Sequence, residues 1–344
     1  MKPDMKMKIY HILAITLLLT LSSCYKDMPF RGMETQPQLN FQCLPGAQDT
    51  TVFCLRSTIP VNQELKETEI VNPKMTFKVN GKEIGLRHNA GLSSTFPSDA
   101  YFAVVPLSAG DRLEFHAEAE GFEPISAQTV IPQEIQELTL SGAIVASPNK
   151  DYYVASLGDR SSQGIGEQVA RFEVTFQDQP DVKDCYMVEV TEYVYSYPSG
   201  VLLPYGYSVA YVVPKLSDID TFEQAQSDVL LAYYQSSLQA VTSYRLPAST
   251  LVLFFDDKEF DGQKYTKEIM VNRLWSGSTI KYRFRLYRVS EELYKYAKAC
   301  DTAQKAEYSG LPFATPFMAY NNIEGGSGIF AGVTVYDSDM IEVE

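Results

Sequence analysis

The sequence predicts a mainly β fold: an immunoglobulin-like β-sandwich followed by a larger β-rich domain with one or two helices. Three observations predict this class. Short runs rich in β-branched and aromatic residues alternate with polar residues along most of the chain. Turn-forming pairs such as Asn80-Gly81 separate these runs. Helical periodicity is clear in one segment, after Ser290, and weaker in a second, residues 221–235.

The first domain is predicted from short strands with turns roughly every ten residues, the spacing of a sandwich. Asn80-Gly81 is the strongest hairpin signal. In residues 112–119 apolar and polar side chains alternate cleanly, with Leu113, Phe115 and Ala117 expected to face inward. The predicted strands cover residues 75–79, 82–84, 101–105, 112–119 and 127–131. We therefore expect an immunoglobulin-like sandwich over residues 39–136.

The second domain, residues 137–344, is also predicted to be rich in strands. The expected strands are residues 172–176, 186–195, 251–255, 280–289 and 333–336, the last preceded by a glycine-rich turn at 321–330. Ser290 can cap a helix whose first turn holds Glu291 and Glu292. Leu293, Tyr296, Ala297 and Cys300 fall on one face of it. The second expected helix covers residues 221–235.

The N-terminus carries the pattern of a bacterial lipoprotein signal. Lys2, Lys6 and Lys8 precede an apolar run over residues 12–21, which is too short for a permanent transmembrane helix. Leu21-Ser22-Ser23 then leads to Cys24. In such signals the thiol of this cysteine receives a diacylglycerol and the peptide is cut before it. We expect residues 1–23 to be removed, Cys24 to be lipidated, and residues 24–38 to form a tether.

Composition excludes some partners. The formal net charge is −14, and the signal takes away more lysines than acids, so the remaining chain is more acidic still. Nucleic-acid-binding proteins show basic patches, so no nucleic acid is expected as a partner. No apolar run after Cys24 approaches the length of a membrane span. The lipid is therefore the expected anchor.

The cysteine pattern excludes a zinc site, because no CxxC pair or Cys/His cluster is present. Cys43 and Cys54 flank the turn signal Leu44-Pro45-Gly46 and can face each other across a hairpin. A disulfide between them would suit an oxidising compartment. Two separately buried thiols are the alternative.

An acidic turn provides a weak calcium candidate. Asp257, Glu259, Asp261 and Glu268 nearly reproduce the spacing of an EF-hand loop, with Gly262 at the sharp turn. Glutamate at the third position and strand-like flanks both count against it. We favour a β-hairpin with its tight turn at Asp261-Gly262, and we predict no metal.

Catalytic motifs are scarce in this sequence. His116 is expected on the polar side of its strand and His88 in a loop, and no Gly-x-Ser-x-Gly motif appears. The glycines of residues 326–332 lack the lysine of a P-loop and are better explained as a turn. We expect neither an enzyme nor a cofactor, although a pair of acidic residues acting on a glycoside would leave no motif.

Tyrosines offer a possible recognition surface. The sequence has 23 of them, and many follow residue 150. One group surrounds Pro198 and Pro204: Tyr193, Tyr195, Tyr197, Tyr205, Tyr207 and Tyr211. Tyrosines on loops supply rigid contact area for recognition. Half-buried filling of a strand-rich domain explains them equally well.

Several short segments together resemble a known family. They are Cys24 after its signal, Ala119-Glu120-Gly121-Phe122, residues 127–132, Phe254-Phe255-Asp256-Asp257 with Phe260-Asp261-Gly262, Tyr287-Arg288-Val289-Ser290 with Tyr294, residues 312–316, and residues 321–330. In this order they resemble a Bacteroidetes outer-membrane lipoprotein family defined only as a domain of unknown function. Cys43 and Cys54 are departures from its pattern.

The resemblance implies a location and a partner. Such proteins are typically encoded beside TonB-dependent transporters, which implies a lipid-anchored protein of the outer membrane, at the cell surface, that captures or presents substrate for a transporter. It implies no catalytic or ligand-binding residue. The alternative function is a structural or adhesive, fimbrillin-like surface subunit, which would need a removable strand or an open groove for strand exchange.

Overall fold

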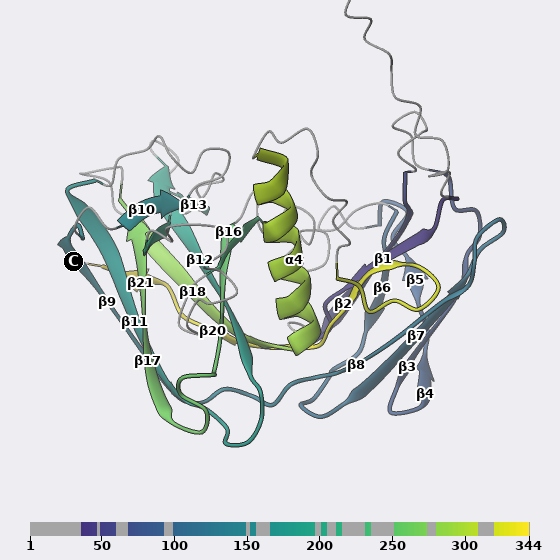
Figure 1. Ribbon diagram of the computed structural model, residues 1–344, viewed down its shortest axis with the longest axis horizontal. Coiled ribbons are helices and arrows are strands. Elements are labelled where there is room, and N and C mark those ends of the chain that lie inside the picture. Colours follow the sequence, from purple (N-terminus) through teal and green to yellow (C-terminus); the bar gives the residue numbers. More distant parts are fainter. Residues whose placement is uncertain are drawn as a thin grey trace, which may run out of the picture. The chain divides into compact units, whose positions relative to one another are not determined.

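The computed structural model describes residues 36–46, 49–59, 68–92, 99–148, 152–155, 166–196, 201–204, 211–214, 231–234, 251–273, 280–308 and 320–343. Almost all of them belong to one compact unit made of Pro37–Thr58 and Glu67–Glu344. The architecture is mainly β, with several sheets and the helix α4 (Glu291–Tyr308), so the predicted fold class is confirmed (Figure 1). Within the described residues no helix is long and apolar enough to cross a membrane.

Two sheets enclose the first core. One is five-stranded, in the order β19 (Ser327–Phe330), β1 (Leu39–Cys43), β2 (Thr50–Ser57), β6 (Tyr101–Val104) and β5 (Arg87–His88). The other is four-stranded, in the order β4 (Lys82–Ile84), β3 (Lys74–Val79), β7 (Arg112–Glu118) and β8 (Ile125–Val130). Both contribute to one apolar cluster, which includes Phe41, Phe53, Phe77 and Phe115.

Local sequence explains the four-stranded sheet. Along β7 the side chains alternate strictly between exposed and buried, with Leu113, Phe115 and Ala117 inside, as predicted. The hairpin between β3 and β4 turns at Asn80 and Gly81, whose φ angles are 51° and 78°. Two positive φ values match the type I′ turn that such a pair favours. These sequence predictions are confirmed.

Two further sheets enclose a second core. A five-stranded sheet has the order β10 (Tyr152–Ala155), β14 (Tyr211–Pro214), β17 (Lys264–Asn272), β11 (Gln168–Gln177) and β9 (Gln136–Ala146). A seven-stranded sheet has the central order β15 (Leu231–Tyr234), β16 (Leu251–Asp256), β12 (Cys185–Ser196), β18 (Ile280–Val289) and β20 (Val333–Asp337). In it β13 (Val201–Pro204) pairs with β12, and β21 (Ile341–Glu342) pairs with β18.

The seven-stranded sheet is buried on both faces along part of its length. Tyr186 and Val188 of β12 belong to the core shared with the five-stranded sheet that contains β11. Cys185 and Met187 point to the other face, into a cluster that also contains Val52 of β2 and Leu293 of α4. This explains why β16 reads as a nearly continuous apolar run.

Helix α4 confirms the helix predicted after Ser290. Leu293, Tyr296 and Ala297 are buried in the cluster below it, and Cys300 is partly buried against the same cluster. The cap differs from the prediction: the Ser290 carbonyl accepts from the backbone N–H of Leu293, but its hydroxyl has no hydrogen-bond partner. Glu291 instead holds the first turn through ion pairs with Lys183 and Lys295.

Two other expectations need correction. The helix predicted over residues 221–235 is wrong in its last turn, because Leu231–Tyr234 is strand β15 and pairs with β16; the rest of that segment lies outside the described residues. The glycine-rich turn predicted at 321–330 contains a strand, β19, which pairs in parallel with β1. The domain boundary at 136/137 stays a prediction.

Candidate functional site

The acidic turn predicted as a hairpin connects two different sheets. Strand β16 lies in the seven-stranded sheet and pairs with β12, whereas β17 lies in the other sheet of the same sandwich and pairs with β11. The hairpin prediction is therefore wrong. Residues 257–263 cross from one sheet to the other, because both flanking strands are apolar enough to be central and each finds its partner elsewhere.

A second connection crosses between the same two sheets beside it. Residues 178–184 join β11 to β12. The backbone N–H of Asp178 donates to the Gln263 carbonyl at 3.1 Å, and the N–H of Asp257 donates to the Asp184 carbonyl at 3.2 Å. The Asp257 carboxylate also accepts from the backbone N–H of Asp184. The two connections thus form one hydrogen-bonded corner.

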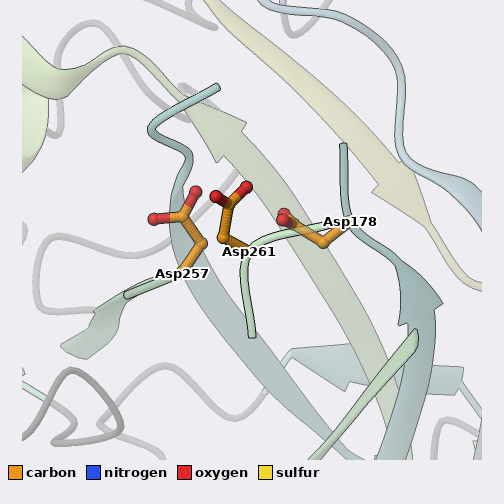
Figure 2. A group of neighbouring side chains, drawn as sticks. All are labelled: Asp178, Asp257 and Asp261. Atoms are coloured by element: carbon orange, nitrogen blue, oxygen red, sulfur yellow. The ribbon is translucent and has the colours of Figure 1, made fainter. Parts of the chain in front are cut away.

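Three carboxylates meet at this corner. Asp178, Asp257 and Asp261 each place a carboxylate oxygen within 4.8 Å of the others (Figure 2). Asp178 and Asp257 are buried and Asp261 is exposed. Of the predicted calcium candidates, Glu259 is exposed and Glu268 lies on β17, where it pairs with Arg171. Asp178 was missed because it is far away in the sequence and only the sheet crossing brings it here.

Burial and like charges raise the proton affinity of the corner. The pKa of Asp257 is raised to about 7, first by burial and then by the nearby charges of Asp178, Asp256 and Asp261. Burial, together with the hydrogen bond that its hydroxyl donates to Asp178, also raises the pKa of Tyr186 well above its usual value.

The corner carries the oxygen ligands that a hard cation prefers, but these oxygens accept hydrogen bonds from the protein's own backbone. Oxygen ligands suit calcium. The protein already donates a hydrogen bond to each carboxylate: the N–H of Gly262 reaches Asp178 at 2.8 Å, and the N–H of Asp181 reaches Asp261 at 3.0 Å. Gly262 has φ +68°, and a Cβ there would lie 2.7 Å from Pro180 Cβ. The acidic residues therefore link the two connections to each other through hydrogen bonds.

A different buried acid lies on the other face of the seven-stranded sheet. Glu189 of β12 is fully buried and faces Arg285 of β18 directly. Arg285 Nη1 lies 3.0 Å from one carboxylate oxygen, and the Tyr287 hydroxyl donates to the other at 2.8 Å. Asp337 of β20 pairs with Arg285 and Arg283. Burial raises the pKa of Glu189, and the charge of Arg285 opposes the shift.

This network also pairs the cations that alternate along residues 280–289. Lys281, Arg283 and Arg285 alternate along β18, and each is matched by an acid: Glu342, Asp337 and Glu189 respectively. Two of these acids, Asp337 and Glu342, come from the last twenty residues, far in sequence from β18. The stripe is therefore neutralised within the sheet and offers little net charge to an anion.

Cys43 and Cys54, which the sequence left open as either a disulfide or two buried thiols, are both free cysteines. In the β1–β2 ladder Gln42, one residue before Cys43, is the partner of Cys54. Successive side chains on a strand point to opposite faces, so Cys43 lies in the first core and Cys54 in the cluster under α4. Burial raises the pKa of Cys43, and it raises that of Cys54 to about 12. The alternative of two separately buried thiols is the observed one.

The two histidines among the described residues lie on the surface. His116 is exposed on the outer side of β7, 3.2 Å from Glu118, and His88 is exposed on β5 beside the Tyr101 ring. The position of His116 matches the sequence expectation, whereas His88, expected in a loop, belongs to the short strand β5.

The tyrosine group is only partly covered by the structure. Tyr193 is half-buried on β12, opposite Pro204 of β13. Tyr195 follows on the same strand, and Tyr211 begins β14, which belongs to the other sheet of this sandwich. Tyr197, Tyr205 and Tyr207 lie outside the described residues, as does Cys24. Tyr193 and Tyr211 therefore do not share one sheet, and the tyrosine recognition face stays a prediction.

Comparison with solved structures gives remote similarities. The matches include a protein described as membrane anchored from Corynebacterium diphtheriae (10% identity, TM-score 0.17, 74% of this chain and 55% of that one). They also include the C-terminal domain of the AgI/II polypeptide BspA from Streptococcus agalactiae (8% identity, TM-score 0.17, 73% and 94%) and a carbohydrate-binding module of the β-sandwich superfamily (9% identity, TM-score 0.16, 69% and 96%). The chain thus spans about half of the Corynebacterium protein.

None of the curated proteins matches this sequence. A family model does, over residues 27–339, which is most of the chain. The matched region includes strands of all four sheets and α4, with the carboxylate corner and strand β19, and it ends before β21. The chain belongs to the family described as "Domain of unknown function (DUF4249)".

Proposed function

We propose that this chain is a non-enzymatic, lipid-anchored binding protein, an accessory of a TonB-dependent outer-membrane transporter that captures or presents substrate. One observation carries the proposal: the lipoprotein signal ending at Cys24 precedes a body made of β-sandwiches. A lipid anchor, a short tether and a rigid sandwich keep a binding surface close to the membrane and free to turn.

The chemistry of the described residues supports a binding role. Two buried acids have their hydrogen-bond partners within the protein: Glu189 accepts from Arg285 and Tyr287, and Asp178 accepts from Tyr186 and the backbone of Gly262. His116 and His88 lie on exposed strands of the first core, remote in sequence from both acidic groups. A general acid or base needs a reacting group within hydrogen-bond reach. The hydrogen bonds of these acids are instead made with other groups of the folded protein.

The anchor is tested with Cys24→Ala. We expect this variant to leave the membrane fraction almost completely, because the sequence shows no second apolar anchor. Cys300→Ala is the matched control, since Cys300 is only partly buried on α4, and it should stay in the membrane fraction. Wild-type protein that is soluble and carries an unmodified N-terminus in mass spectrometry would exclude lipidation.

The partnership is tested by pull-down from solubilised membranes, followed by mass spectrometry. We expect a TonB-dependent transporter to be recovered with the wild-type chain. Alanine at Tyr193, Tyr195 and Tyr207 should reduce its recovery, because tyrosine provides contact area at low entropic cost. Tyr152→Ala, on β10, is the control. Unchanged recovery with the triple variant would discard the tyrosine face, and no transporter at all would discard the partnership.

The fimbrillin-like alternative is favoured by one specific observation. Strand β19 completes the first sandwich although it comes from the far end of the chain, and strand exchange between subunits needs a strand of this kind. Recovery of ladders of this protein itself, without a transporter, would support that alternative over the accessory role.

A further inference from the structure

Strand β19 closes one side of the first sandwich. It lies at the end of the five-stranded sheet beside β1, and the residues around it also contact β8, the last strand of the four-stranded sheet. Its own neighbours in sequence belong elsewhere, since α4 precedes it and β20 pairs with β18 of the seven-stranded sheet. The yellow end of the ribbon beside β1 shows this return (Figure 1).

Backbone hydrogen bonds hold the returning segment on both sides. It pairs in parallel with β1, so that Asn40 faces Ser327 and Cys43 faces Phe330. On the side of β8, Ser126 and Glu324 exchange both backbone bonds, at 3.0 and 2.9 Å. The next residues continue the contact with the chain after β1, where the N–H of Val333 donates to the Pro45 carbonyl at 2.9 Å.

Glycines let this segment approach the neighbouring backbone more closely than any side chain allows. A Cβ on Gly328 would lie 1.9 Å from the Phe41 carbonyl oxygen, and φ there is +120°. A Cβ on Gly326 would lie 2.5 Å from the Leu39 carbonyl oxygen, and one on Gly332 would lie 2.2 Å from that of Val130. Contacts under 3 Å with backbone cannot be relieved by a rotamer change, so these positions require glycine.

Side chains of the segment join two cores. Phe330 is buried in the first core, with its ring 5.7 Å from Phe41 and 6.4 Å from Phe115. Ile329 points the other way, into the cluster that contains α4. Asn322 fixes Phe330 with two bonds, its Nδ2 donating to the carbonyl at 2.7 Å and its Oδ1 accepting from the N–H at 3.0 Å.

We propose that residues 321–332 act as an intramolecular donor strand, and that the channel between β1 and β8 is a binding site for an extended, glycine-bearing peptide. The site recognises its ligand through the backbone of β1 and Ser126, through close approaches that accept only glycine, and through a pocket for one aromatic ring. The occupant in the folded protein is this chain's own segment.

Removing the strand has a definite physical cost. Strand β1 becomes a bare edge with unpaired N–H and C=O groups, and the stacked rings of Phe41 and Phe115 lose Phe330. The second core keeps all its own strands. It loses only the support that β20 receives from the segment before it. Loss of the donor strand therefore weakens the first sandwich selectively.

The direct test is Gly328→Val in the full-length chain, with Gly81→Val as the matched control. Both glycines have positive φ, but a Cβ on Gly81 meets nothing within 4 Å. In hydrogen-exchange mass spectrometry we expect Gly328→Val to lower the protection of β1 and β8 by at least about tenfold relative to β11 and β12. Gly81→Val should leave β1 protected. Equal loss in both variants, or unchanged protection of β1 in Gly328→Val, would overturn the proposal.

A peptide with the sequence of residues 321–332 tests the site itself. It should bind Gly328→Val, restore the protection of β1, and bind wild-type protein far more weakly because the channel is filled. The same peptide with valine at the position of Gly328 is the control and should not bind. Failure of the glycine peptide to restore β1 would exclude an acceptor channel.

Native-state exchange of the wild-type protein covers the case in which Gly328→Val does not fold. In moderate denaturant we expect β19, β1 and β8 to open together before β11 and β12 do. Opening of β19 while β1 stays protected would show that the strand is dispensable and would overturn the proposal.

Discussion

The seven-stranded sheet and the corner beside it both bury acids, but they neutralise them differently. Glu189 faces a guanidinium across the strand pair and receives a phenol hydroxyl. Asp178 and Asp257 lie near each other and near Asp261, and they accept bonds mainly from backbone N–H groups. An ion pair with a cation stabilises the charged form of a buried acid. Backbone N–H groups carry no full positive charge, so the negative charges of neighbouring acids still favour binding of a proton to one of them. The comparison predicts different responses to mutation, pH and calcium.

The largest effect is expected for Arg285→Met. It leaves the Glu189 carboxylate buried without its cation, which costs about 3–5 kcal/mol of unfolding free energy. Urea denaturation measures the loss. Arg283→Met is the control, because Arg283 is one-third exposed and its ion pair with Asp337 is worth at most about 1 kcal/mol. Equal losses in the two variants would show that burial of the pair is irrelevant.

The double variant Glu189→Gln with Arg285→Met sharpens this result. Removing both charges removes the uncompensated ion, so we expect it to be more stable than Arg285→Met alone by about 1 kcal/mol or more. A double-mutant cycle in urea measures the coupling. Strictly additive losses would mean that the two groups do not interact across the strands.

At the corner, Asp257→Asn tests the competition for a proton. The native pKa of about 7 lies above the ordinary value of 3.8, so the folded chain holds a proton that the unfolded chain has lost between these values. The stability from this group is therefore present at pH below about 4 and is lost as pH rises through about 7. Asparagine keeps a carbonyl oxygen for the Asp184 N–H and has no proton to lose.

We expect the melting temperature of the wild-type protein to fall between pH 5 and pH 8, and that of Asp257→Asn to fall less. Asp181→Asn, an exposed change in the same corner, is the control and should follow the wild type. A variant that loses as much stability as the wild type over this range would exclude Asp257 as the titrating group.

The smallest effect is expected for calcium. Because the corner carboxylates already accept hydrogen bonds from the protein, millimolar calcium should leave the melting temperature unchanged. Magnesium at the same concentration controls for ionic strength. A rise of several degrees with calcium that Asp261→Ala abolishes would instead make the corner a metal site.

Sequence reasoning found the elements and some of their faces but few of their partners. It placed β7, the Asn80-Gly81 hairpin, β18 and the start of α4, because alternation, turn chemistry and helical spacing are local properties. It paired β16 with β17 wrongly, since a short connection with Asp-Gly looks the same whether the chain turns back or crosses to another sheet. Two of the three corner carboxylates, Asp257 and Asp261, were found from their local spacing, and Asp178 was not.

By itself, the sequence determined the mainly β class and the positions of the most regular strands, because each depends on residues within one short window. Tertiary structure alone decided which strands share a sheet, that Cys43 and Cys54 face opposite ways, and that residues 327–330 lie beside β1. A shift of one residue in register exchanges the two faces of a strand, and apolar strands can pair with many others. Only the packing of residues from both ends of the chain around one core selects among these pairings.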